Sequence, residues 1–214
     1  AHFAAAGAEE QLASLISYIQ DRYPEIPVIL DAKRGDVGST ATQYAKEAFE
    51  RYAADAVTVN PYLGHESLAP YFEYADRGVI VLCRTSNPGS DWIQGIKVSG
   101  KPLYLSVAQQ VHQWDENDQC MLVTGATYPE ELGQVRECVG DMPLLVPGVG
   151  AQGGDVEAVI QAGLDSSGAG LCISSSRGII YAGSGPDFGE QAGRAAKLLR
   201  DQINGARLLV GTAA

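Results

Sequence analysis

Residues 26–52, IPVILDAKRGDVGSTATQYAKEAFERY, contain an apolar run, a cluster of charged residues and a helical stripe in direct succession. The run at 26–30 is short and rich in branched residues, as a buried strand is. From Ala41 to Tyr52 apolar residues recur at intervals of three and four, which is the spacing of one helix face. This stretch therefore predicts a strand, a polar turn and a helix.

The same unit recurs along the chain. Further short apolar runs predict strands at 56–60, 79–83, 120–124, 144–147 and 171–174. Helical stripes occupy 104–111, the segment that starts at Pro129, and 192–203. Alternating strands and helices imply a parallel sheet, and strands that are apolar on consecutive residues imply that both faces of the sheet are covered. We expect an α/β protein, and the pattern fits both a closed barrel and an open sheet.

The composition is that of a folded protein with an acidic surface. Hydrophobic residues make up 45% of the 214 residues, too many for a disordered chain. The net charge of -11 argues against a nucleic-acid-binding protein, which needs a basic face. No apolar run approaches the roughly 20 residues of a membrane span. We expect a cytoplasmic protein that binds neither nucleic acid nor membrane.

The cysteines and histidines give no sign of a metal site. The four cysteines, at 83, 120, 138 and 172, lack the spacing of metal ligands, and we expect reduced core residues. His65 is followed by a glutamate but lacks the second histidine of a zinc motif, and the other histidines are isolated. The cysteines and histidines therefore offer no candidate metal site.

The charged cluster at 31–36 is the strongest candidate for chemistry. On a strand, Asp31 and Lys33 lie two residues apart and face the same way, whereas Arg34 faces the other way. Asp36 follows in the loop. Two carboxylates beside one ammonium would keep Lys33 protonated, which suits a proton donor to a developing carbanion. The alternative is a salt bridge that merely ends a core strand.

A second cluster, PGVGAQGGD at 147–155, contains the pattern GxGxxG. A dinucleotide fold is disfavoured, because this loop comes late in the chain and the next strand ends in serines rather than in an acidic residue. A glycine-rich loop still presents backbone N–H groups to an anion, and Ser176 with Arg177 adds a cation. We therefore predict a phosphate site; ordinary turns and a surface arginine are the alternative.

The number of strands bears on the choice of fold. A (β/α)8 barrel has eight strands in about 250 residues, and its phosphate site typically follows strands seven and eight. Six strands are visible, and the two predicted phosphate loops follow the last two. We therefore expect one domain over 1–214, a (β/α)8 barrel lacking about its first two strands, with roughly 40–60 further residues before Ala1. The glycine- and proline-containing segment 87–101 is predicted as a mobile loop.

Together, Asp31-x-Lys33-x-x-Asp36, the run RTSNPG at 84–89, the run LVPGVGAQGGD at 145–155 and Ser176-Arg177 resemble the orotidine 5'-phosphate decarboxylase family, particularly its bacterial group. The resemblance covers essentially the whole chain. It implies a TIM-barrel homodimer that converts orotidine 5'-monophosphate to UMP and CO₂ in pyrimidine biosynthesis, without metal or cofactor.

The resemblance also implies roles for individual residues. Asp31 would lie against the substrate carboxylate, and Lys33 would stabilise and then protonate the C6 carbanion. Asp36 and Thr40 would act in the neighbouring subunit's site, Thr40 on the ribose. The implied substrate-binding residues are Thr40, Ser86 at the pyrimidine, Pro147, Gln152 between base and phosphate, Gly153, and Ser176 with Arg177 at the phosphate.

Two further family residues, an aspartate that binds ribose and a second lysine of the charged network, would lie before Ala1. Other readings of the same motifs stay open. One is a Mg²⁺-dependent decarboxylase or aldolase of sugar phosphates from the same superfamily, and metal dependence would distinguish it. The other is a nucleotide-binding protein without catalysis, which UMP binding without turnover would support.

Overall fold

The computed structural model describes residues 1–150 and 153–211, and within them a six-stranded sheet has the order β1-β2-β3-β6-β7-β8. The five apolar runs predicted as strands after the first one all coincide with strands of this sheet. The parallel α/β fold predicted from the sequence is therefore confirmed. The strands are β1 (Ile29–Arg34), β2 (Ala56–Val59), β3 (Gly78–Arg84), β6 (Cys120–Thr124), β7 (Leu144–Pro147) and β8 (Leu171–Ser174).

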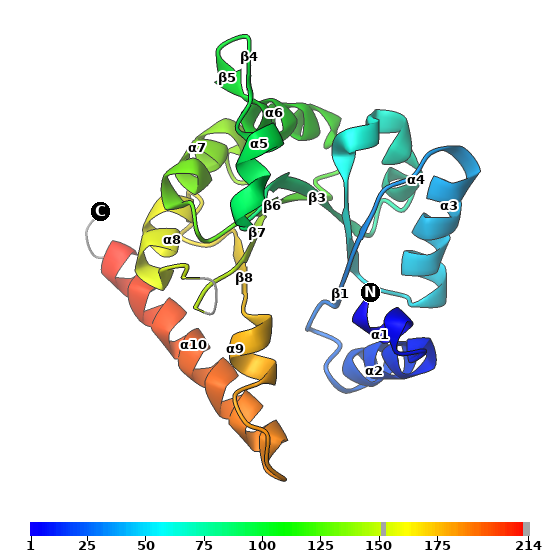
Figure 1. The fold of residues 1–214 in the computed structure, drawn as a ribbon, viewed down its shortest axis with the longest axis vertical. Coiled ribbons are helices and arrows are strands. Elements are labelled where there is room, and N and C mark those ends of the chain that lie inside the picture. Colours follow the sequence, from blue (N-terminus) through cyan, green and yellow to red (C-terminus); the bar gives the residue numbers. More distant parts are fainter. Residues whose placement is uncertain (151–152, 212–214) are drawn as a thin grey trace. The chain divides into compact units, whose positions relative to one another are not determined.

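The chain divides into two compact units, one of Ala1–Leu82 with Asp115–Met121 and the other of Cys83–Trp114 with Leu122–Ala214. The first unit holds the parallel pairs β1·β2 and β2·β3. Its helices are α1 (His2–Ala5), α2 (Glu9–Arg22), α3 (Gly38–Lys46) and α4 (Ala69–Phe72), with the 3-10 turns η2 (Pro61–Leu63) and η3 (His65–Ser67). Helices α3 and α4 pack against each other (Figure 1).

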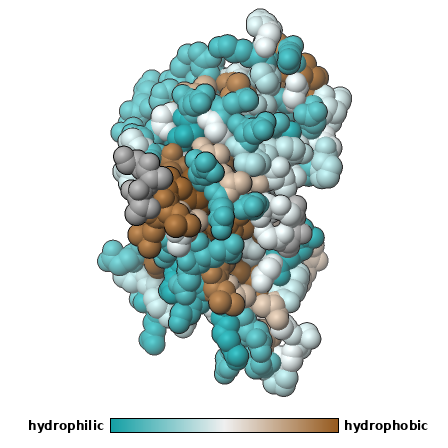
Figure 2. Space-filling view, turned by 90° about the vertical axis from the view of Figure 1, so that its left-hand side faces the viewer, coloured by the Kyte–Doolittle hydropathy of each residue, from teal (hydrophilic) through white to brown (hydrophobic). Residues whose placement is uncertain are grey.

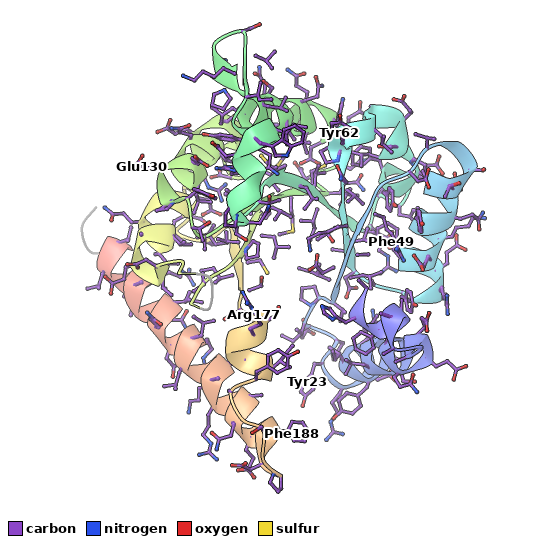
Figure 3. All side chains as sticks on the ribbon, viewed as in Figure 1. Tyr23, Phe49, Tyr62, Glu130, Arg177 and Phe188 are labelled. Atoms are coloured by element: carbon purple, nitrogen blue, oxygen red, sulfur yellow. The ribbon has the colours of Figure 1, made fainter. Side chains whose placement is uncertain are left out.

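The helix predicted over 41–52 changes type at its middle. It is an α-helix to Lys46 and a π-helix, η1, over Glu47–Arg51, where the amide of Tyr52 reaches back to the carbonyl of Glu47. The predicted stripe is buried at Ala41, Ala45, Ala48, Phe49 and Tyr52, and Tyr44 is half-buried. Phe49, labelled in Figure 3, meets the ring of Tyr74 at a centroid distance of 5.0 Å. The π-turn therefore belongs to the core of this unit.

The second unit contains the parallel pairs β6·β7 and β7·β8. Its helices are α6 (Leu103–Trp114), α7 (Pro129–Val139), α8 (Val156–Gly163), α9 (Ser176–Ile180) and α10 (Phe188–Gly211). Figure 1 shows α6, α7, α8 and α10 as successive neighbours, and each packs on the next. Figure 2 shows apolar side chains at the surface on the side where α10 lies; the exposed leucines of this helix are Leu198, Leu208 and Leu209.

Two expectations about elements need correction. The first strand begins later than predicted and runs on through the charged cluster to Arg34. The segment 87–101, predicted as a loop, contains the 3-10 turn η4 (Pro88–Ser90), the short helix α5 (Asp91–Gln94) and the antiparallel strands β4 (Lys97–Val98) and β5 (Lys101–Pro102). We call residues 85–102 the β3–α6 excursion. Glycine and proline in this segment therefore mark turns between short elements.

All four thiols are free, and the core position predicted for the cysteines holds for Cys83 and Cys120, which are buried, whereas Cys138 and Cys172 are only half-buried. Burial raises the pKa of the Cys83 and Cys120 thiols above the ordinary range. Within the described part of the chain, no helix combines the length and apolar character needed to cross a membrane.

Candidate active site

The charged cluster of the first unit forms a close ion pair at the end of β1. The ammonium Nζ of Lys33 lies 2.5 Å from Oδ1 of Asp31, and both side chains are about half exposed. The two residues do share a face, as their spacing predicts, although the strand is irregular here. Leu30 lies opposite Val57 and Arg34 opposite Val59, so β1 has two residues more than β2 in this interval. Lys33 has φ +51°, in the left-handed region that non-glycine residues rarely adopt.

The hydroxyl of Thr58 on β2 contacts both members of the ion pair. Its Oγ1 accepts a hydrogen bond from the backbone N–H of Lys33 at 2.9 Å and donates one to Oδ1 of Asp31 at 2.9 Å. Thr58 is completely buried. No pattern in the sequence indicates this role, because a threonine within an apolar, β-branched run looks like any strand residue.

The other residues of the charged cluster point elsewhere. Arg34 turns away from Lys33, as predicted, and pairs with Glu47 at 2.6 Å while its guanidinium lies 4.5 Å from the ring centre of Tyr44. Asp36 accepts a hydrogen bond from the amide of Val37. Within residues 1–150 and 153–211, the carboxylate bonded to the Lys33 ammonium is that of Asp31.

Thr40 lies on α3, exposed at the surface. It lines an open depression of about 730 Å³ that continues along α3 and η1. Lys46, Glu47, Glu50 and Arg51 make the rest of this depression strongly charged. Thr40 therefore faces outward on the helix that follows the charged cluster.

The predicted phosphate loops meet in the second unit. Pro147 at the end of β7 and the following Gly148 and Val149 line a small pocket of about 90 Å³ together with residues 174–177 at the end of β8 and beyond it. The hydroxyl of Ser175 donates to the carbonyl of Val149 at 3.2 Å and ties the two loops together. Figure 3 shows Arg177 at the start of α9, directly after β8. The structure thus brings Pro147, Ser176 and Arg177 to one pocket.

The glycine-rich loop between β7 and α8 depends on its glycines. Gly153 has φ +87°, and a Cβ on Gly154 would lie 2.5 Å from the Cβ of Ala126. Asp155 then caps α8 by accepting hydrogen bonds from the amides of Glu157 and Ala158. Gln152 lies outside the described residues.

Ser86 follows β3 in the second unit. The carbonyl of Ser86 accepts a hydrogen bond from the hydroxyl of Thr127. A Cβ on Gly125 would lie 2.7 Å from the backbone of Ser86, so the loop after β6 can approach this residue closely only because position 125 is glycine. The backbone of Ser86 is therefore supported by the neighbouring strand's loop.

Arg84, the last residue of β3, anchors the excursion that follows it. Its side chain is only 1% exposed and forms an ion pair with Glu131 of α7. It donates to Oγ of Ser90 at 2.5 Å and stacks over the ring of Tyr128, 4.0 Å from its centre. Burial alone would lower the pKa of Arg84, but the hydrogen bond and charge of Glu131 outweigh it, so the pKa is raised. From the sequence alone, this arginine is identified only as the first residue of the run RTSNPG, with no role assigned to it.

Comparisons with known proteins relate most of this chain to one family. Residues 1–189 match the family described as "Orotidine 5'-phosphate decarboxylase / HUMPS family". Two relatives, each named "Orotidine 5'-phosphate decarboxylase", come from Janthinobacterium sp. (strain Marseille) and Ralstonia pickettii (strain 12J). They are 59% and 58% identical over 205 residues, which cover 95% of this chain and 76% of each relative.

A solved structure shares the fold. It is described as "Structure of Leishmania donovani OMP decarboxylase", is 38% identical, and superposes with a TM-score of 0.83. The match covers 95% of this chain and 76% of that one. The barrel class expected from the sequence is thereby supported by a structural relative as well as by the order of strands.

Proposed function

Because the chain belongs to the orotidine 5'-phosphate decarboxylase / HUMPS family, we propose that it decarboxylates orotidine 5'-monophosphate to UMP and CO₂, a step of pyrimidine biosynthesis. The observation that carries this proposal is the 58–59% identity, over 95% of the chain, to proteins named for that activity. The ion pair of Lys33 and Asp31 gives the activity a chemical basis.

Lys33 is the residue that carries the proposed chemistry. Loss of CO₂ leaves the electron pair of the broken bond on C6 of the pyrimidine ring. A fixed positive charge at this carbon lowers the energy of the carbanion, and the ammonium of Lys33 supplies it. One proton then passes from Nζ to C6, which completes UMP and leaves the lysine neutral until it takes up a proton from water.

Asp31 holds the ammonium and lies against the leaving group. Its Oδ1 is 2.5 Å from Nζ of Lys33, so the carboxylate directs the ammonium. In the proposed complex the substrate carboxylate lies next to Asp31. The negative charges of Asp31 and of the substrate carboxylate repel each other in the bound substrate. This repulsion is relieved when CO₂ leaves, which assists the reaction.

The remaining site residues bind the nucleotide. Arg177 and the backbone at Ser176 bind the phosphate, and the hydrogen-bonded loops of the phosphate pocket support this role. Gln152 bridges base and phosphate, and Pro147 and Gly153 are further substrate-binding residues. Ser86 hydrogen-bonds the pyrimidine. Binding energy from the phosphate, far from the breaking bond, can be used to order the site.

Asp36 and Thr40 act in the site of a second copy of the chain in the proposed homodimer. Their positions support this assignment. Asp36 is bonded to its own loop rather than to Lys33, and Thr40 faces outward on α3. The cytoplasmic location expected from the sequence stays a prediction.

The test is a spectrophotometric assay of the full-length protein with orotidine 5'-monophosphate, in the presence and absence of EDTA. We expect decarboxylation that EDTA does not reduce. Activity on a sugar phosphate that EDTA abolishes, with no consumption of the nucleotide, would identify the Mg²⁺-dependent enzyme instead. Tight UMP binding without turnover would identify a non-catalytic nucleotide-binding protein.

A further inference from the structure

We infer that Thr58 is a positioning residue that fixes Lys33 and Asp31 in the arrangement needed for proton transfer to the substrate. The inference rests on the proposed function for its chemistry and on the geometry of β1 and β2 for its position. All four residues of β2 are buried, and packing of this strand in the core needs only apolar side chains. The hydroxyl of Thr58 therefore calls for another explanation.

The backbone at Lys33 needs an external hydrogen-bond acceptor. In a regular parallel ladder a strand N–H bonds a carbonyl of the next strand. Between Leu30 and Arg34 the register shifts, and the N–H of Lys33 bonds the Oγ1 of Thr58 in place of a carbonyl. Lys33 also has φ +51°, a conformation that persists only when its surroundings hold it. The hydroxyl of Thr58 is one such restraint.

The same hydroxyl also fixes the far end of the lysine. A hydroxyl has one proton to donate, and Thr58 donates it to Oδ1 of Asp31, the oxygen that also binds Nζ of Lys33. The four groups close a ring: backbone N–H of Lys33, hydroxyl of Thr58, carboxylate of Asp31 and ammonium of Lys33. The backbone of Lys33 is thereby tied directly to the buried Oγ1 of Thr58, and its ammonium is tied to the same oxygen through Asp31.

The ion pair alone would hold its geometry poorly. The side chains of Asp31 and Lys33 are 61% and 49% exposed, and a solvated pair of this kind contributes little because water screens it. Thr58 is completely buried, so its bonds are not exchanged with solvent. The protected hydroxyl gives the exposed pair a fixed reference point.

Three variants separate positioning from strand stability. Thr58→Val removes the hydroxyl and keeps the shape of the side chain, whereas Thr58→Ser keeps the hydroxyl and removes the methyl. Thr124→Val is the matched control. Thr124 is a completely buried threonine at the end of β6, and its hydroxyl has no hydrogen-bond partner among the described residues.

The expected result is a split between kcat and KM for orotidine 5'-monophosphate. Because a displacement of about 1 Å in a reacting group can reduce turnover about 100-fold, kcat of Thr58→Val should fall by about 10- to 100-fold. KM should change by less than about threefold, since the phosphate contacts stay intact. Thr58→Ser and Thr124→Val should keep kcat within about threefold of the wild type. All assays are run well below the Tm of each variant.

A crystal structure of Thr58→Val gives a second readout that needs no activity. The φ of Lys33 should leave the left-handed region, or the contact between Nζ and Asp31 should open. The inference is wrong if that structure keeps both features, if Thr58→Val retains wild-type kcat, or if Thr58→Ser is as impaired as Thr58→Val. An inactive wild-type protein would refute the proposed function, while the crystal structure would still decide the positioning role.

Discussion

The ammonium of Lys33 meets a carboxylate on one side and is exposed to a prospective ligand on the other. We expect Lys33→Ala in the full-length protein to lower kcat for orotidine 5'-monophosphate by at least ~10²–10⁴-fold, the range for loss of a general acid alone. UMP binding, measured by calorimetry, should be affected far less. A variant that kept kcat within about tenfold of the wild type would exclude Lys33 as the proton donor.

Arg177 should act through the phosphate of the substrate. Arg177→Ala is expected to raise KM and to lower kcat/KM, with a loss of about 2–4 kcal/mol in transition-state stabilisation. The reason is that a charge-assisted hydrogen bond to the phosphate is lost, and with it the remote binding energy. The control uses a second substrate rather than a second variant. Orotidine, which lacks the phosphate, should be converted equally slowly by both proteins, and an equal loss with orotidine would mean that Arg177 does not bind phosphate.

Tyr71 is a buried residue whose hydroxyl has no hydrogen-bond partner among the described residues. Tyr71→Phe should therefore leave the free energy of unfolding at pH 7 unchanged or raise it by about 1 kcal/mol. Tyr74→Phe is the control, because the Tyr74 hydroxyl donates to Glu50 at 2.6 Å and its loss should destabilise. Urea unfolding of both variants measures the difference.

Tyr71 should also make the free energy of unfolding depend on pH. Burial raises the pKa of Tyr71 from its ordinary value of 10 to about 12. Between these values the unfolded state loses the phenol proton first, so the contribution of Tyr71 to stability is complete below pH 10 and declines as the pH rises towards 12. Tyr71→Phe should lose less stability than the wild type over this range; an identical decline in both proteins would assign the effect to other groups.

At the scale of single residues, sequence spacing predicted the contact between charged side chains but not the hydrogen bonds between neighbouring strands. The interval of two between Asp31 and Lys33 predicted their contact, which the structure confirms. The prediction assumed a regular strand with alternating side chains. The contact forms even though β1 is bulged between Leu30 and Arg34. Thr58 was missed because its hydroxyl acts across two strands, and a neighbour in the sheet cannot be identified from one strand's sequence.

At the scale of elements, apolar runs located the strands but not always their ends. The strands at 120–124, 144–147 and 171–174 match their predicted bounds. The first strand continues into charged residues, because main-chain pairing with β2 extends beyond the apolar stretch. In the β3–α6 excursion, the short elements are held by polar contacts between Arg84 and the residues Ser90 and Asp91, and such contacts leave no periodic pattern in the sequence.

The β3–α6 excursion should loosen when its anchor is removed. Arg84→Met leaves the carboxylate of Glu131 without its cation, and we expect a loss of about 3 kcal/mol in the free energy of unfolding. Amide hydrogen exchange in 85–94 should become faster. Arg194→Met, which breaks the exposed pair with Glu190, is the control and should cost less than about 0.5 kcal/mol. Equal effects of the two substitutions would contradict the anchoring role.

At the scale of the whole molecule, the proposed site is shared between two copies of the chain. A dimer that combines a Lys33→Ala chain with an Asp36→Ala chain has one site with both lesions and one with neither. Co-refolding equal amounts of the two inactive proteins should restore about a quarter of wild-type activity, since about half of the dimers are mixed and one of their two sites is intact.

The controls for this experiment are each variant refolded alone, which should stay inactive, and the two refolded variants mixed without unfolding. Activity that does not recover on co-refolding would mean that Asp36 serves the site of its own chain. The size of the recovered fraction also tests whether the assembly is a dimer, because larger shared assemblies give a different proportion of intact sites.

The left-handed backbone at Lys33 sets thermal stability against catalysis at one position. Glycine and asparagine adopt this region with less strain than lysine, so either would relax β1 while removing the amine. Sorting a mutant library for heat resistance alone would therefore drive lysine out of position 33, whereas sorting for turnover would keep it. Evolution of this chain towards higher temperature has to find its gains at other residues.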